Sequence, residues 1–238
     1  MGKIIGLVPR ATLFEDNIPH HDIFFFVNPY VQQIVKQGAT PLGLLPADGY
    51  ASEDALALCD AFLLAGCNKI WPYHLQVIEH ALAKHKPVLG ICLGMQSIAA
   101  YFHVLDRAEA LGMDRPVNII SLFEEMKKER FMFTWPIEHH YLENVTRESA
   151  EKSRHSINVK TGTRLYEILG TTEAEAVSLH SYQIAPVASR LQISAVADDG
   201  SIEGIEYGRF IVGVQFHPEV DCLWDKLFAA FVHDEWAA

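Results

Sequence analysis

Cysteine is scarce in this sequence: the 238 residues include four, Cys59, Cys67, Cys92 and Cys222. Their spacing matches neither the ligand pattern of a zinc site nor a dense disulfide framework. Few cysteines are typical of a protein that works in a reducing compartment. The sequence therefore predicts a chain with no metal site and no disulfide scaffold.

Long apolar runs and an excess of basic residues are also missing. No stretch reaches the roughly eighteen apolar residues that a membrane helix needs, and residues 1–6 lead straight into a short strand pattern rather than the longer apolar segment of a signal peptide. The formal net charge of −11 argues against electrostatic binding to nucleic acid. We therefore expect a cytoplasmic protein that binds neither membranes nor nucleic acids.

Hydrophobic residues are plentiful, at 50% of the chain, which is enough for a sizeable core. Short buried-strand patterns alternate with helical patterns, and this alternation predicts an α/β fold: three layers, with a mainly parallel sheet and helices on both faces. Residues 1–238 fit a single domain. The expected strands are 3–9, 40–46, 61–65, 87–91 and 210–216, with a hairpin at 192–207, and the expected helices include 28–38, 52–59, 163–169 and 223–231.

Two stretches interrupt this alternation. Residues 10–22 are polar and predict a loop over the site. Residues at about 105–150 contain a charged helical patch and predict a helical insertion or cap. His139, His140 and His155 lack the spacing of metal ligands, so we interpret them as surface histidines.

The most informative stretch is Pro87-Val-Leu-Gly90-Ile-Cys92-Leu-Gly94, where an apolar run becomes a helical pattern. A nucleophile on a sharp strand-to-helix turn needs small neighbours, and Gly90 and Gly94 meet that need. The N-terminus of the following helix would favour a thiolate at Cys92. The pattern predicts a nucleophile elbow, although a buried strand end with a structural cysteine would show the same sequence pattern.

A second stretch supplies the partners that a cysteine nucleophile needs. The strand pattern at 210–216 ends in His217-Pro218-Glu219, a base and a carboxylate two residues apart. Pro218 stiffens the turn, so that both side chains can point to one side. We therefore predict a catalytic triad of Cys92, His217 and Glu219.

These two motifs, Gly90-Ile-Cys92-Leu-Gly94-Met-Gln96 and Gln215-Phe-His217-Pro-Glu219, resemble those of the class I glutamine amidotransferase superfamily. Within it, the N-terminal half is more similar to the γ-glutamyl hydrolase branch, the C26 peptidase group. The resemblance covers most of the chain except about 105–150. It implies a flavodoxin-like fold, a small γ-glutamyl amide as substrate, a γ-glutamyl thioester intermediate and no cofactor.

The resemblance also implies further site residues. Gly66 and Cys67 follow a strand where the superfamily places its oxyanion hole, and the N–H of Leu93 would be the other donor. Cys67 stands where the family normally has a second glycine. Gln96, one turn into the elbow helix, and His180, in Ser178-Leu-His180-Ser-Tyr-Gln183, would face the substrate. A solvated or core-edge Gln96 and a structural His180 remain open alternatives.

Two other functions also remain open. The same triad would serve a glutaminase subunit that passes ammonia to a synthase partner. The altered Gly66-Cys67 turn would also suit a catalytically idle, ligand-binding relative. Self-association into a homo-oligomer is left open. Because the chain resembles the C26 group over its N-terminal half, we expect a free-standing γ-glutamyl hydrolase.

Overall fold

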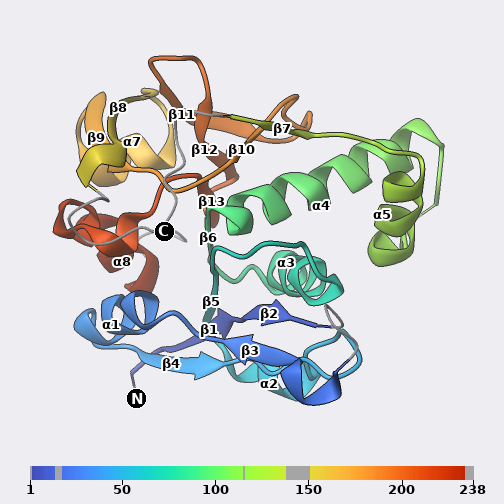
Figure 1. The fold of residues 1–238 in the computed structure, drawn as a ribbon. Helices are drawn as coiled ribbons and strands as arrows, with labels where there is room; N and C mark the ends of the chain where they lie inside the picture. Colours follow the sequence, from blue (N-terminus) through green and yellow to red (C-terminus); the bar gives the residue numbers. More distant parts are fainter. Residues whose placement is uncertain (1, 14–17, 115, 138–150, 234–238) are drawn as a thin grey trace.

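A nine-stranded sheet runs through the middle of the molecule in the computed structural model, which describes residues 2–13, 18–114, 116–137 and 151–233 (Figure 1). Its strands, in spatial order, are β4 (Thr40–Gly43), β1 (Ile4–Val8), β5 (Ala61–Leu64), β6 (Val88–Ile91), β13 (Ile211–Val214), β12 (Ile202–Tyr207), β11 (Gln192–Ala197), β8 (Arg154–Val159) and β9 (Glu173–Val177).

The first five strands in this order are parallel, and the remaining four extend the sheet by antiparallel pairing. Every residue of β5, β6 and β13 is buried, as expected for parallel strands covered on both faces. The predicted α/β fold with a mainly parallel, flavodoxin-like core is therefore confirmed. The antiparallel half includes the predicted hairpin, whose strands are β11 and β12.

Helices cover both faces of the sheet, so the molecule has three layers (Figure 1). One face carries α2 (Glu53–Leu58), α3 (Pro72–Lys84), α4 (Leu93–Ala110) and α5 (Ile119–Lys128); the other carries α1 (Asn28–Lys36), α7 (Arg164–Leu169) and α8 (Asp225–Val232). The helix starts follow local chemistry, because Pro72 occupies the first turn of α3 and the Thr163 hydroxyl accepts a hydrogen bond from the Tyr166 N–H in α7.

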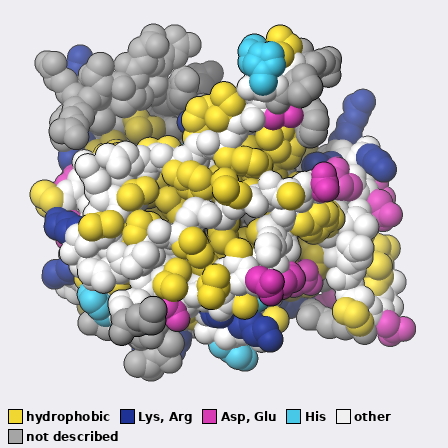
Figure 2. All heavy atoms as spheres, turned by 90° about the horizontal axis from the view of Figure 1, so that it is seen from below, with side chains coloured by type: hydrophobic (Ala, Val, Ile, Leu, Met, Phe, Trp, Pro, Cys, Tyr) yellow, Lys and Arg dark blue, Asp and Glu magenta, His cyan; other side chains and the backbone are white. Residues whose placement is uncertain are grey.

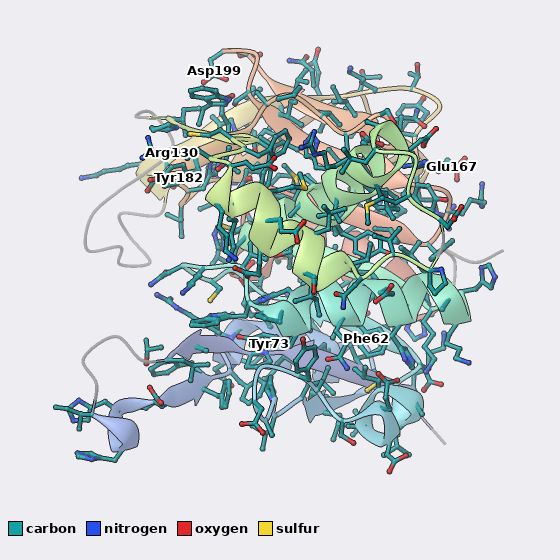
Figure 3. All side chains as sticks on the ribbon, turned by 90° about the vertical axis from the view of Figure 1, so that its right-hand side faces the viewer. Phe62, Tyr73, Arg130, Glu167, Tyr182 and Asp199 are labelled. Carbon is teal, nitrogen blue, oxygen red and sulfur yellow. The ribbon has the colours of Figure 1, made fainter. Side chains whose placement is uncertain are left out.

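Short elements complete the fold: the two-stranded sheets β2 (Arg10–Thr12) with β3 (Ile23–Phe25) and β7 (Thr134–Pro136) with β10 (Tyr182–Ile184), and the 3₁₀ helices η1 (Pro19–His21), η2 (Glu151–Ser153), η3 (Pro218–Val220) and η4 (Cys222–Trp224). The prediction of a continuous loop over residues 10–22 was wrong at its start, since β2 pairs with β3. Tyr73 of α3 points toward this ribbon, where its ring meets Phe24 edge-on (Figure 3).

The described part of the insertion at 105–150 holds the end of α4, helix α5 and strand β7. Helix α5 buries Leu122, Phe123 and Met126 in the core on the α3–α4 side of the sheet. His139 and His140 lie outside the described residues. Within the described ranges, no group of three or more His, Cys, Asp or Glu side chains is arranged to hold a metal ion.

Apolar side chains gather on the face of the molecule shown in Figure 2, which contains the β4 edge of the sheet. Ile23, Phe25 and Leu45 are among the exposed large apolar residues of this end. None of the helices in the described ranges combines the length and apolar character needed to cross a bilayer.

Helix α4 begins in unusually close contact with the end of β5. A Cβ atom added at Gly94 would lie 2.2 Å from the Leu64 carbonyl oxygen, a distance that no side chain can occupy. A Cβ added at Gly90, in β6, would lie 2.7 Å from the Gly94 carbonyl carbon. The two glycines therefore let strand, turn and helix pack against one another at the point where Cys92 lies.

Replacing Gly94 by alanine should destabilise the protein strongly, because the obstructing atom belongs to the backbone of a buried strand. We expect a loss of about 3 kcal/mol or more in the free energy of unfolding. Urea denaturation followed by circular dichroism measures it. Gly66→Ala is the matched control, since its Cβ would meet no atom closer than 3.4 Å. Equal unfolding midpoints for the two variants would contradict this packing argument.

Candidate active site

Cys92 lies on the turn between β6 and α4, with φ 55° and ψ −112°. Such a backbone conformation costs a residue with a side chain about 1–3 kcal/mol. Hydrogen bonds hold it on both sides: the Cys92 N–H donates to the Val214 carbonyl at 2.8 Å, and the Gln96 N–H donates to the Cys92 carbonyl at 3.2 Å. The turn thus has the strained geometry of a nucleophile elbow.

His217 follows β13, the strand next to β6, and its N–H donates to the Val177 carbonyl at 2.8 Å. Its Nδ1 lies 2.7 Å from Glu219 Oε1, and Glu219 is held in the short helix η3. The other ring nitrogen, Nε2, is buried. Burial alone would lower the pKa of His217, but the Glu219 carboxylate and the Cys92 sulfur together raise this pKa well above its ordinary value.

Tyr30, from α1, lies behind this pair and is 2% exposed. Its hydroxyl accepts a hydrogen bond from the Gly66 N–H at 3.4 Å. Burial, followed by the nearby negative charges of Glu219 and Cys92, raises the pKa of Tyr30 well above its usual range. The hydroxyl therefore stays protonated and contributes a dipole, not a charge, beside the carboxylate.

The turn after β5 brings Gly66 and Cys67 to Cys92. A Cβ placed on Gly66 would be 3.4 Å from both Cys92 Cβ and His217 Cε1. Because the Gly66 N–H is taken by Tyr30, the N–H groups available here are those of Cys67 and Leu93; within the described residues neither has a hydrogen-bond partner. Cys67 is not among the described non-glycine residues with positive φ, so its side chain causes no backbone strain.

A pocket of about 540 Å³ opens beside Cys92, a size typical of small-molecule sites. Its walls come from four parts of the chain: the turn after β5, the start of α4, the insertion (α5 and β7) and the segment leading into β10. Tyr182, on this last wall, is labelled in Figure 3. The lining residues are Cys67, Asn68, Lys69, Ile70, Cys92, Leu93, Gln96, Phe123, Lys127, Phe133, Thr134, Leu179, His180, Ser181 and Tyr182.

Gln96 and His180 both line this pocket, but their polar atoms are differently engaged. Gln96 Nε2 donates to Gln215 Oε1 at 3.2 Å and to the Tyr182 carbonyl at 3.4 Å. His180 has Nδ1 3.0 Å from the same carbonyl and Nε2 3.3 Å from the buried Glu203 carboxylate. Both ring nitrogens of His180 are therefore occupied, which favours its structural interpretation over direct substrate binding.

Sequence reasoning missed several residues that the fold brings to the site. Tyr30 lies within the helix predicted over 28–38, but nothing in that pattern indicates that its side chain reaches the site, and no motif singles out Glu203. The insertion supplies Phe123, Lys127 and Thr134 to the pocket wall. The helical period of residues 30–35 reveals which side of α1 is buried, but not that this side meets Glu219.

Cys92 should be the most reactive of the four cysteines, because His217 can take its proton. Burial raises the pKa of the Cys59 thiol to about 11, which keeps it protonated. We expect iodoacetamide, followed by peptide mass spectrometry, to label Cys92 at least about tenfold faster than Cys59, Cys67 or Cys222. His217→Ala should abolish the difference. Equal labelling of Cys92 in wild type and variant would contradict the assignment.

Comparison with known proteins identifies the family of the chain. A family model for class-I glutamine amidotransferases matches residues 62–226. A Schizosaccharomyces pombe protein provisionally named a glutamine amidotransferase is 28% identical over 214 residues, which are 80% of this chain and 73% of that one. A CTP synthase of Sulfurisphaera tokodaii is 30% identical over 156 residues, which are 60% of this chain but 27% of that enzyme.

Solved structures show the same fold at low sequence identity. The glutaminase domain of the Trypanosoma brucei CTP synthase, solved with bound acivicin, superimposes with a TM-score of 0.62 at 16% identity, covering 98% of this chain and 94% of that one. A glutamine amidotransferase of Thermotoga maritima superimposes with a TM-score of 0.58 at 16% identity, covering 100% of this chain and 85% of that one. With the family model matching more than half of its residues, the chain belongs to the class-I glutamine amidotransferase family.

Proposed function

We propose that the protein hydrolyses γ-glutamyl amide bonds through a γ-glutamyl thioester on Cys92. The observation that carries this proposal is the position of Cys92: its backbone is strained at the mouth of a pocket, and the His217–Glu219 pair stands beside it. A strained nucleophile with an oriented base is the arrangement that acyl transfer needs. Among the described residues that line the pocket, no other group offers a comparable nucleophile and base.

The proposed reaction has two steps. In the first, the Cys92 sulfur, whose proton has already passed to His217, attacks the δ-carbonyl carbon of the substrate, and the N–H groups of Cys67 and Leu93 stabilise the oxyanion. His217 then returns the proton to the leaving nitrogen, so the C–N bond breaks and a thioester remains. In the second step, His217 activates a water molecule, the thioester breaks and glutamate leaves. Glu219 orients the imidazole throughout.

The size of the pocket favours a leaving group larger than ammonia. About 540 Å³ lie beside Cys92, and a second pocket of about 500 Å³ adjoins it, sharing Lys69, Ile70 and Lys127. Glutamine alone would leave much of this space to solvent. The extra wall comes from the insertion, in α5 and β7. A γ-glutamyl hydrolase needs such room for its leaving amine, whereas a glutaminase does not.

A glutaminase subunit that supplies ammonia to a synthase partner is the second candidate. The matches to CTP synthases support it, because a solved glutaminase domain of one such enzyme shares this fold. The triad geometry serves both reactions equally. The two candidates differ in which substrates the isolated chain cleaves.

The purified chain should release glutamate from γ-glutamyl peptides or γ-glutamyl amines in the absence of any partner. A panel that includes glutamine, assayed by enzymatic glutamate detection, tests this, with Cys92→Ala as the folded control. We expect Cys92→Ala to lose at least about 1,000-fold in turnover. Turnover of glutamine alone would favour the glutaminase, and wild-type turnover by Cys92→Ala would refute the mechanism.

Glu219→Gln should shift the alkaline limb of the pH profile of kcat/KM to lower pH. His217 must be protonated to donate to the leaving nitrogen, and its raised pKa keeps it protonated to higher pH than an ordinary imidazole. Activity should therefore extend to higher pH than an unperturbed histidine would allow, and decline as pH rises through the pKa of His217. Removing the carboxylate charge lowers that pKa, so the alkaline limb of kcat/KM should shift to lower pH, with at least about a 100-fold loss of rate. An unshifted limb would show that Glu219 does not set the charge of His217.

A further inference from the structure

The charge of the pocket lining is opposite to that of the whole chain. The protein carries 30 acidic and 19 Lys or Arg residues, for a net charge of −11. Yet among the described residues that line the pocket beside Cys92, the Lys, Arg, Asp and Glu side chains are two lysines, Lys69 and Lys127, with no carboxylate. In a chain rich in carboxylates, a wall of this kind selects for an anionic group on the ligand.

The positive charge of Lys69 is compensated less by neighbouring groups than that of Lys127. Its Nζ lies 4.3 Å from the centre of the Trp71 ring, a cation–π contact that holds the side chain without neutralising it. In the described part of the chain, no carboxylate forms an ion pair with Lys69. A further cation lies close by, since Arg10 Nη2 donates to Asn68 Oδ1 at 3.0 Å and Asn68 also lines the pocket.

Lys127, on α5, attracts an anion less strongly than Lys69 does. Its Nζ lies 2.6 Å from Glu124 Oε1, so part of its charge is already compensated. The same nitrogen lies 5.2 Å from the centre of the Phe123 ring, which is part of the pocket wall. Lys127 therefore contributes less than Lys69 to binding an anion in this pocket.

The two lysines mark the end of the pocket that is remote from the nucleophile. Lys69, Ile70 and Lys127 line both this pocket and the second one, whereas Cys92 and Gln96 line only the first. A γ-glutamyl group bound for attack fills the space around Cys92. The seam between the pockets is then left to the group attached to the scissile nitrogen.

The second pocket limits how far from Cys92 a negative charge on the leaving group can lie. Its lining includes Asp22, Asp48 and Glu124, which repel an anion placed beyond the seam. A carboxylate is therefore best accommodated at the lysines themselves, at the seam between the two pockets.

We propose that the leaving group is a short amino acid whose carboxylate binds Lys69, assisted by Lys127, so that the substrates are γ-glutamyl dipeptides rather than γ-glutamyl amines. This inference rests on the proposed hydrolase function. It assigns Lys69 as a specificity residue, because it contacts the leaving group and not the reacting atoms.

An isosteric substrate pair tests the proposal. γ-Glutamylglycine and γ-glutamylglycinamide differ in the charge of the terminal group but not in its size. We expect wild type to prefer the acid by about threefold to tenfold in kcat/KM, mainly through KM, as befits a partly exposed ion pair. Lys69→Met should lower this preference by about threefold or more. Lys69→Arg should retain it, and Lys84→Met, an equal change of net charge on an exposed residue of α3, should leave it unchanged.

Each other outcome overturns a defined part of the account. An unchanged preference in Lys69→Met overturns the assignment of Lys69. Equal losses for both substrates would mean that Lys69 holds the glutamyl carboxylate, which also overturns it. If neither dipeptide shows Cys92-dependent turnover, the proposed function fails and the leaving-group assignment fails with it.

The charge of the pocket can also be measured without turnover. Iodoacetate and iodoacetamide both transfer a carbon to the Cys92 sulfur and release iodide, and they differ in charge. The rate of reaction with iodoacetate divided by the rate with iodoacetamide at Cys92 reports the local electrostatic potential. Cys222, which is exposed, is the internal reference. Lys69→Met should lower this ratio at Cys92 by about threefold but not at Cys222. An unaltered ratio at Cys92 would show that Lys69 does not set the potential there.

Discussion

The contact between the first turn of α4 and the end of β5 is the constraint on which the site depends. Because Gly94 has no side chain, the helix approaches the Leu64 carbonyl closely enough to force a sharp turn at Cys92. The three strands that end here, β5, β6 and β13, are adjacent and parallel. Their carboxyl ends therefore bring together the parts that the proposed reaction needs: N–H groups from the turn after β5, Cys92 from the end of β6 and His217 from the end of β13.

Electrostatics then couples these groups. His217 and Glu219 are largely buried, so their mutual attraction is poorly screened, and it outweighs the cost of removing the imidazole from water. Tyr30 lies beside Glu219 and also fixes the Gly66 N–H, which links α1 to the site. The turn after β5 adds Lys69 and helix α5 adds Lys127 to a pocket whose described lining has no other Lys, Arg, Asp or Glu side chain. The site thus combines Cys92, His217 and Glu219 at the strand ends with a pocket wall to which the insertion contributes.

The predictable parts of the structure are those with a local signal. The glycines around Cys92 and the His217-Pro218-Glu219 turn are readable because their chemistry depends on neighbours in sequence, and the apolar strand runs are readable because both faces of the sheet are covered. Long-range partners were not predictable. His180 meets Glu203, 23 residues away, through the pairing of distant segments, and no periodicity encodes that contact. Strand β2 was missed because three residues are too few for an alternation pattern.

The proposed thioester between Cys92 and the acyl group of the substrate is tested most directly by trapping that intermediate. Hydroxylamine added during turnover of a γ-glutamyl dipeptide competes with water for the thioester and yields γ-glutamyl hydroxamate. If acylation limits turnover, hydroxamate formation should rise with hydroxylamine concentration while the rate of amine release stays unchanged. Cys92→Ala should form no hydroxamate. Glutamate release with no hydroxamate at any hydroxylamine concentration, or hydroxamate formation by Cys92→Ala, would contradict the thioester mechanism.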